Sequence, residues 1–141
     1  MKGALAMRAM IAAMLAAFGL IGAAPAQGPG LKALAGIELG QWHLRAPDQV
    51  TGGRSICITD PQILLQIRHG GAQCSRFVID DSPQSTTVSY SCPGSGHGRT
   101  TISVETPRLI RIDTQGVADG QPFALEFEGR RVGACARMGR H

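Results

Sequence analysis

Four cysteines constrain the fold of this chain more than any other feature of its sequence. Two of them, Cys74 and Cys92, end a stretch that is typical of a β-hairpin, with β-branched and aromatic residues in both arms. Pro83 lies at the centre of a three-residue turn, residues 82–84, which is a common hairpin length. This symmetry predicts Cys74 opposite Cys92, where opposed residues lie about 4.5–5.5 Å apart and a disulfide can form. The register also pairs Asp81 with Ser85, Val78 with Val88, and Arg76 with Tyr90.

The remaining cysteines, Cys57 and Cys135, then pair by elimination, because four cysteines allow only three connectivities. Their disulfide would tie the last strand to an early one and contribute about 3–5 kcal/mol in the chain-entropy model. A zinc site and a redox-active pair are the alternative interpretations. Both favour Cys-x-x-Cys spacing, which this sequence lacks, so we predict two structural disulfides.

The N-terminal segment predicts export. Lys2 and Arg8 precede an apolar run, residues 10–21, and Ala24-Pro25-Ala26 then forms a small-x-small site. This pattern predicts a signal peptide over residues 1–26. The alternative, a retained membrane anchor, would need about 20 apolar residues. No later stretch is long and apolar enough to span a membrane, and no cysteine follows the run to carry a lipid. We therefore expect a periplasmic or secreted protein with no membrane span after cleavage.

Charge and composition limit the kinds of partner that the mature chain could bind. Cleavage lowers the number of basic residues from 14 to 12 and leaves all 10 acidic residues, so the mature charge is about +2. Basic residues are dispersed and aromatic residues are few, so we expect no nucleic-acid partner. We predict a flexible tether over residues 27–36, one disulfide-linked β-domain over 37–136, and a short tail over 137–141.

Short alternating segments predict most of the secondary structure. The clearest is Phe123–Glu128, in which Phe123, Leu125 and Phe127 share one face. Asp60 followed by Pro61 indicates a helix start, and we predict a helix to His69 with Ile63, Leu64 and Ile67 on one face. With the two hairpin arms, the sequence has seven predicted strands, the others being Gln41–Ala46, Arg54–Thr59, Arg99–Thr106 and Leu109–Thr114.

Regular short strands predict an all-β, mainly antiparallel fold. The simplest arrangement is a single curled up-and-down meander, or a small barrel of about seven strands, with one short helix. A Greek-key sandwich is the alternative.

Candidate catalytic residues are few. None of the histidines (His43, His69, His97 and His141) has a partner at metal-ligand spacing, so we predict neither a metal site nor a cofactor. His97 lies in a glycine-rich segment, Gly94–Gly98, which we expect to be a loop. Asp80 and Asp81 are adjacent on a strand and would point to opposite faces, which disfavours an acid/base pair.

Several short sequence segments together resemble a known protein family. They are Gly40-Gln-Trp42, Cys57-Ile-Thr-Asp60, the Cys74 and Cys92 pair, and the ending Gly129–Cys135. This pattern resembles the exported bacterial family called domain of unknown function 3617, over about residues 37–135. The resemblance implies an exported β-rich domain in which the four cysteines are disulfide partners. It implies no activity and carries over no other functional residue.

We therefore expect a non-enzymatic exported β-domain that binds a small apolar ligand or an envelope partner. The apolar ligand is suggested by the one-sided pattern of Trp42, Ile102, Ile110, Phe123 and Phe127, although the same residues could simply fill a small barrel. One alternative is a small envelope hydrolase that uses His97 and a nearby carboxylate. Another is a structural interaction module that pairs through an exposed strand edge.

Overall fold

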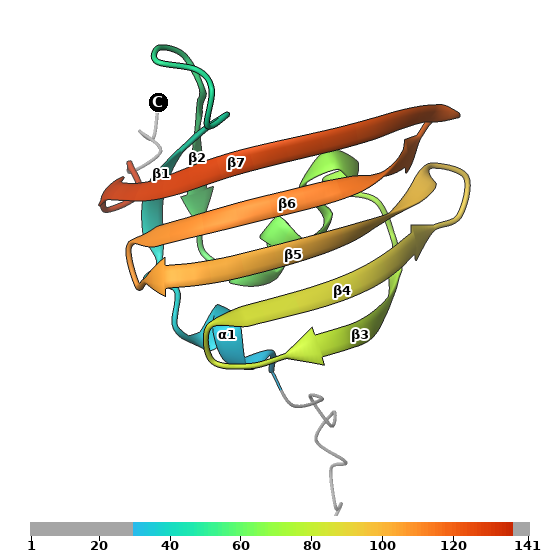
Figure 1. Ribbon diagram of the computed structural model, residues 1–141, viewed down its shortest axis with the longest axis horizontal. Helices are drawn as coiled ribbons and strands as arrows, with labels where there is room; N and C mark the ends of the chain where they lie inside the picture. Colours follow the sequence, from blue (N-terminus) through green and yellow to red (C-terminus); the bar gives the residue numbers. More distant parts are fainter. Residues whose placement is uncertain (1–29, 137–141) are drawn as a thin grey trace, which may run out of the picture.

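A computed structural model describes residues 30–136 as one open, seven-stranded antiparallel sheet with two short helices (Figure 1). The predicted signal peptide, residues 27–29 and the tail 137–141 lie outside the described residues. The elements are α1 (Lys32–Ala35), β1 (Gly40–Arg45), β2 (Arg54–Ile58), η1 (Pro61–His69), β3 (Ser75–Asp81), β4 (Ser85–Cys92), β5 (Gly96–Thr106), β6 (Leu109–Ala118) and β7 (Gln121–Gly133).

The strand order is β2-β1-β7-β6-β5-β4-β3. Strands β3 to β7 form an uninterrupted meander, and the β1–β2 hairpin joins the far side of β7, so the first and last strands are neighbours. The predicted all-β meander is confirmed. Neither the small barrel nor the Greek-key sandwich forms, because one sheet ends at the separate edges β2 and β3.

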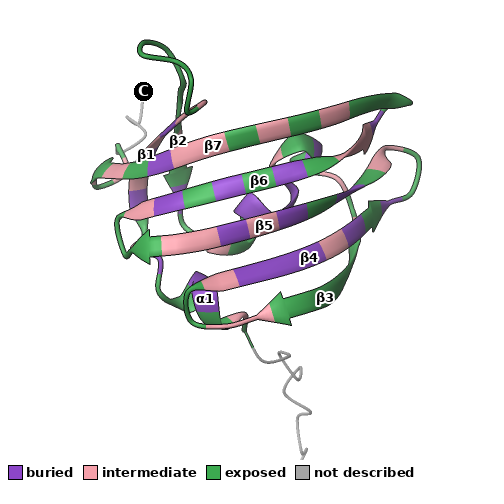
Figure 2. Ribbon diagram, in the orientation of Figure 1, coloured by how far each residue is buried: buried purple, intermediate pink, exposed green. Residues whose placement is uncertain are grey.

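The core lies on one face of this sheet, which we call the inner face. Helix η1 packs on β4, β5 and β6, and α1 packs on β4 and β5. In Figure 2 the buried residues alternate with less buried ones along β5 and β6, as expected for a sheet with one covered face. We call the opposite, more polar side the outer face. The buried apolar cluster comprises Leu34, Ile37, Trp42, Leu44, Ile58, Leu64, Leu65, Val88, Ile102, Ile110 and Ile112.

The hairpin of β3 and β4 follows the predicted register only in part. Val78 lies opposite Val88 and Arg76 opposite Tyr90, as predicted, and residues 82–84 form the turn. A bulge between Val78 and Asp80 then shifts the register, so Asp81 lies opposite Thr86 and not Ser85. The extra residue, Ile79, cannot be read from a symmetric turn, because a bulge breaks that symmetry.

The predicted flexible tether differs from the structure. Residues 32–35 form α1, in which Ala33 and Leu34 are buried. The N–H of Lys32 donates to both carboxylate oxygens of Asp81, at 2.9 and 3.2 Å. The Leu31-x-x-Leu34-x-x-Ile37 spacing, which suits a helix packed on a core, outweighs the glycine and alanine content that suggested a tether.

Helix η1 begins as predicted, with the Asp60 side chain accepting a hydrogen bond from the N–H of Gln62 and Pro61 at the first helical position. It is a 3₁₀ helix, interrupted by non-helical backbone at Gln66. The predicted apolar face is wrong in one residue: Leu65 is buried, whereas Ile63 is exposed. Three residues per turn place a different set of side chains inward than an α-helix would.

Two disulfides join the pairs predicted from the sequence. Cys74–Cys92 closes the open end of the β3–β4 hairpin, with 4.1 Å between the Cα atoms. Cys57–Cys135 links β2 to the end of the described chain across 78 residues. Both disulfides indicate a non-cytoplasmic environment. None of the described helices has the length and apolar character needed to cross a bilayer.

Candidate binding surfaces

Strand β3 forms one edge of the sheet and pairs only with β4 in the part of the chain that the structure describes. Its residues are exposed except for the last, Asp81. Three consecutive apolar side chains stand out: Phe77 is 71% exposed, Val78 47% and Ile79 45%. We call these three residues the β3 apolar edge. Unpaired backbone and exposed apolar side chains therefore occur on the same strand.

The β3 apolar edge presents side chains on both faces of the sheet. Val78 lies opposite Val88, which is buried in the core, so its side chain is on the inner face. Phe77 lies opposite Ser89 and projects from the outer face. An added strand beside β3 could cover both side chains while pairing with the backbone between them.

Polar contacts anchor β3 near both of its ends. The Arg76 guanidinium donates to the side-chain oxygens of Gln62 and Gln66 on η1, at 2.8 and 2.9 Å. At the other end, Asp81 accepts from the backbone of α1, and the Cys74–Cys92 disulfide adjoins Ser75. The edge is therefore held in place as an extended strand, which lowers the entropy cost of pairing with a partner.

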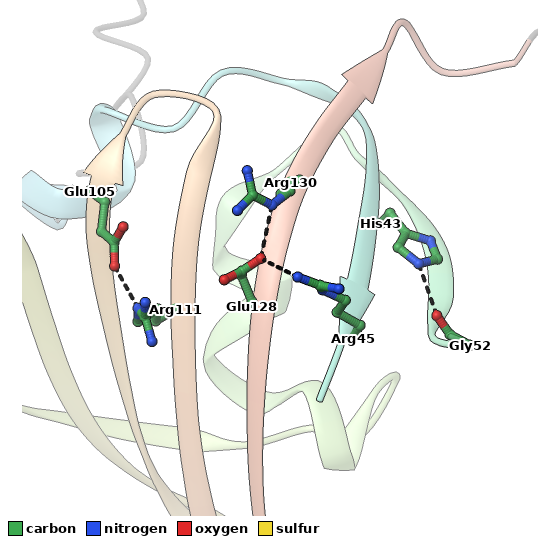
Figure 3. Close-up of polar contacts among 7 residues, drawn as sticks. All are labelled: His43, Arg45, Gly52, Glu105, Arg111, Glu128 and Arg130. Carbon is green, nitrogen blue, oxygen red and sulfur yellow. Dashed lines mark hydrogen bonds and ion pairs between the residues drawn. The ribbon is translucent and has the colours of Figure 1, made fainter. Parts of the chain in front are cut away.

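The outer face of β1, β7 and β6 carries a cluster of charges, drawn in Figure 3. Arg45 lies opposite Glu128 across β1 and β7, and Arg111 lies opposite Glu128 across β6 and β7. Oxygen Oε1 of Glu128 accepts from Arg45 Nη2 at 3.2 Å and from Arg130 Nε at 2.8 Å. Arg111 instead donates to Glu105 on β5. The Glu128 carboxylate thus accepts hydrogen bonds from two guanidinium groups.

The Arg130 hydrogen bond, followed by that from Arg45, holds the pKa of the Glu128 carboxyl below its usual range. Glu128 therefore stays ionised at neutral pH. Since Arg45 and Arg130 are both cationic, the three side chains carry an excess of one positive charge.

A hollow of about 690 Å³ adjoins this cluster on the outer face. Its floor includes His43, and its far wall is the loop Val50–Gly53. His43 Nε2 lies 3.1 Å from the carbonyl oxygen of Gly52. A carbonyl oxygen only accepts, so Nε2 carries the hydrogen and holds the loop against β1.

A second groove, of about 670 Å³, lies where β1 stops at Arg45 and β7 continues with β6 as its one neighbour among residues 30–136. Leu125 and Phe127 line it, and the Arg54 guanidinium carbon lies 6.0 Å from the centre of the Phe127 ring. Asp48 and Glu126 line it as well, so basic and acidic side chains balance one another. This groove therefore shows no preference for the charge of a ligand.

The residues that suggested an apolar ligand divide into two groups. Trp42, Ile102 and Ile110 are fully buried and belong to the core. Phe123 and Phe127 are half-buried on β7, in the part of that strand that pairs with β6 but not with β1. The helices occupy the inner face, so most of the one-sided pattern is explained by the filled core.

His97 lies on strand β5 and is exposed on the outer face, whereas the sequence placed it in a loop. The loop is shorter than expected, because β5 already begins at Gly96. Ser89, Arg99 and Gln115 are among the residues that line the shallow hollow at His97, and no acidic residue does. The carboxylate that the hydrolase hypothesis requires is therefore not part of this surface.

A buried chain of polar side chains around His69 was not predicted from the sequence. Its Nε2 lies 3.1 Å from the carbonyl oxygen of Ser95 and its Nδ1 lies 2.9 Å from the Tyr90 hydroxyl. Nε2 must donate to the carbonyl, so in neutral His69 Nδ1 accepts from Tyr90. Thr114 bonds to Tyr90, and Thr100 lies 2.8 Å from Thr114. Every member of this chain is satisfied, which suits a structural role.

The β3 apolar edge was also missed. The run Phe77-Val78-Ile79 does not alternate with polar residues, and that is the signal that could have marked it. The sequence does not reveal which strand lies at the edge.

Within residues 30–136, no three His, Cys, Asp or Glu side chains are placed to hold a metal ion. The chain matches no protein-family model, no curated protein and no solved structure. The resemblance to domain of unknown function 3617 therefore stays a prediction.

Proposed function

We propose that this protein is an exported, non-enzymatic interaction module that binds an extended segment of another envelope protein along β3. The β3 apolar edge carries the proposal, because one side of β3 pairs with no strand among residues 30–136 and the strand has three exposed apolar side chains. Strand addition supplies affinity through backbone hydrogen bonds and specificity through alternate side chains. A fitting segment would present apolar residues toward both Phe77 and Val78.

A second copy of the chain is a weaker occupant of this edge. Read antiparallel to itself about Val78, the sequence Arg-Phe-Val-Ile-Asp would set Arg76 opposite Asp80 of the other copy. The bulge at Ile79 prevents this pairing, because it places the two side chains on different faces of the sheet. Arg76 lies opposite Tyr90 on the inner face, whereas Asp80 lies opposite Thr87 on the outer face. The two charges would project from opposite sides of the joined sheet.

The exported location is supported by two observations. The sequence of residues 1–26 fits a signal peptide, and both disulfides suit an oxidising compartment such as the periplasm.

Site-specific photo-crosslinking tests the proposal in the periplasm of an expressing bacterium. A photoreactive residue at Phe77 should capture one defined partner, which is then purified and bound in vitro. Amides of β3 should gain protection from hydrogen exchange in that complex. Phe77→Lys and Ile79→Lys should each weaken binding at least tenfold, because a lysine on an edge strand opposes strand addition.

Val50→Lys is the matched control, since Val50 is 90% exposed in a loop outside β3. Equal weakening by Val50→Lys, or protection of amides elsewhere but not on β3, would refute the proposal. A mass that doubles with concentration, and is restored to the monomer by Phe77→Lys, would identify a second copy as the occupant.

A further inference from the structure

The hollow beside His43 has a basic lining. His43, Arg45 and Arg130 line it together with the loop Val50–Gly53, and none of its lining residues is acidic. Both arginines contact the carboxylate of Glu128, whose side chain is only 14% exposed. The three residues and their contacts appear together in Figure 3.

The two guanidinium groups keep donors for a further acceptor. Arg45 gives Glu128 one N–H from Nη2, and Arg130 gives it one from Nε. A guanidinium has five N–H donors, so most remain after these contacts. The side chains are 38% and 58% exposed, which leaves them accessible from the hollow.

The arrangement is also held in place before any ligand arrives. His43 lies opposite Arg130, and Arg45 opposite Glu128, so each basic side chain has a cross-strand neighbour on the same face. The contact of His43 with Gly52 fixes the loop that forms the opposite wall. Gly53 allows this approach, because its φ is 106° and a Cβ there would lie 2.9 Å from His43 Nε2.

We propose that this hollow binds a phosphate group between Arg45 and Arg130. The paired N–H donors of an arginine guanidinium match the geometry of two phosphate oxygens. Two guanidinium groups and the one carboxylate of Glu128 carry a net positive charge, which a phosphate group would neutralise. The group could be inorganic phosphate or the phosphate ester of an envelope lipid, since both present the same oxygens. The site lies on β1 and β7, apart from the β3 apolar edge, and does not depend on the proposed function.

The test uses the oxidised protein, isotopically labelled, with inorganic phosphate as the probe. Phosphate should shift the amide signals of Thr51–Gly53 and the Nε signals of the two arginines in a saturable way. Arg130→Gln and Arg45→Gln should each weaken binding about tenfold or more, the cost of one charge-assisted hydrogen bond. Arg99→Gln is the matched control, because Arg99 is exposed on the same face but outside the hollow.

Two further arms identify the source of the phosphate. Vesicles of phosphatidylglycerol that sediment with the wild type, but not with Arg130→Gln, assign a lipid headgroup, provided that phosphatidylcholine vesicles do not. Binding of inorganic phosphate without vesicle binding assigns the free anion. The proposal is overturned if chloride at equal ionic strength gives the same shifts, if Arg99→Gln weakens binding equally, or if no shift saturates.

Discussion

Tyr90 is the only tyrosine of the sequence, and 2% of its surface is exposed. Burial raises the pKa of its hydroxyl, opposed in part by the hydrogen bond from Thr114. Absorbance of tyrosinate should therefore show native Tyr90 ionising above the ordinary value of about 10, and at that value after denaturation. The stability from the protonated phenol is complete below about pH 10 and is lost as pH rises through the folded pKa. A native midpoint at or below the denatured one would contradict this prediction.

Removing the Tyr90 hydroxyl tests the buried polar chain. Tyr90→Phe leaves Nδ1 of His69 without its donor, which should lower the free energy of unfolding by about 1–3 kcal/mol. Denaturant unfolding, followed by fluorescence of the buried Trp42, measures the change. A loss below about 0.5 kcal/mol, the usual limit for substitutions away from such features, would show that water replaces the hydroxyl.

Gly129 provides a steric test at the residue scale. A Cβ at this position would lie 2.9 Å from Ile110 Cγ1 and from Leu44 Cδ2. Gly129→Ala should therefore overpack the core and lower the free energy of unfolding by about 1–3 kcal/mol. Gly70→Ala is the control, because Gly70 has φ of −54° and no atom within 4 Å of such a Cβ. Equal losses for both variants would disprove the packing argument.

At the element scale, the two disulfides should differ in strength. They close chain segments of 18 and 78 residues, and the chain-entropy model gives about 3 and about 4.5 kcal/mol. The double alanine variant of Cys57 and Cys135 should lose more stability than that of Cys74 and Cys92. Chemical unfolding of both variants measures the order. The reverse order would mean that local support of β3 outweighs loop closure.

The elements themselves were largely readable from the sequence, because alternation and turn residues are local signals. Phe123–Phe127 and the turn around Pro83 were assigned on that basis. The bulge at Ile79 was not, since it depends on how β3 meets the packed strand β4. Helix α1 was missed because a four-residue helix is stabilised by its contacts and not by propensity.

Acid stability is a property of the whole molecule, to which Glu38 and Glu128 contribute. Hydrogen bonds from Arg108 and from Arg130 lower the pKa of these carboxyls. Their stabilisation is present above the unfolded value of about 4.3 and is lost as pH falls through the lowered folded pKa. Unfolding measured from neutral to acidic pH should therefore be less pH-dependent in the double variant Glu38→Gln/Glu128→Gln.

Glu126→Gln is the control for this comparison, because Glu126 forms no ion pair among residues 30–136. The effect should be small, since exposed ion pairs contribute little. An unchanged pH profile in the double variant would show that these ion pairs do not survive in solution.

Strand order was beyond the sequence, and the binding surfaces depend on it. Arg45 and Glu128 are far apart in the chain and meet only because β1 pairs with β7. Phe77 is exposed because it projects from the outer face of β3, whose one neighbour among residues 30–136 is β4. Residue patterns predicted the fold class, whereas the candidate sites arise from pairings that no local pattern encodes.

The pairing of the first strand with the last also dictates when the domain can be completed. Synthesis proceeds from the amino end. The strand that contains Trp42 and Leu44 therefore lacks its neighbour, Gln121–Gly133, until almost the whole domain has been synthesised. Over the same interval Cys57 lacks its native disulfide partner, because Cys135 has not yet been synthesised. A chain truncated before β7 would therefore expose apolar side chains and leave Cys57 as a free thiol. We expect chaperones and proteases to bind such a fragment.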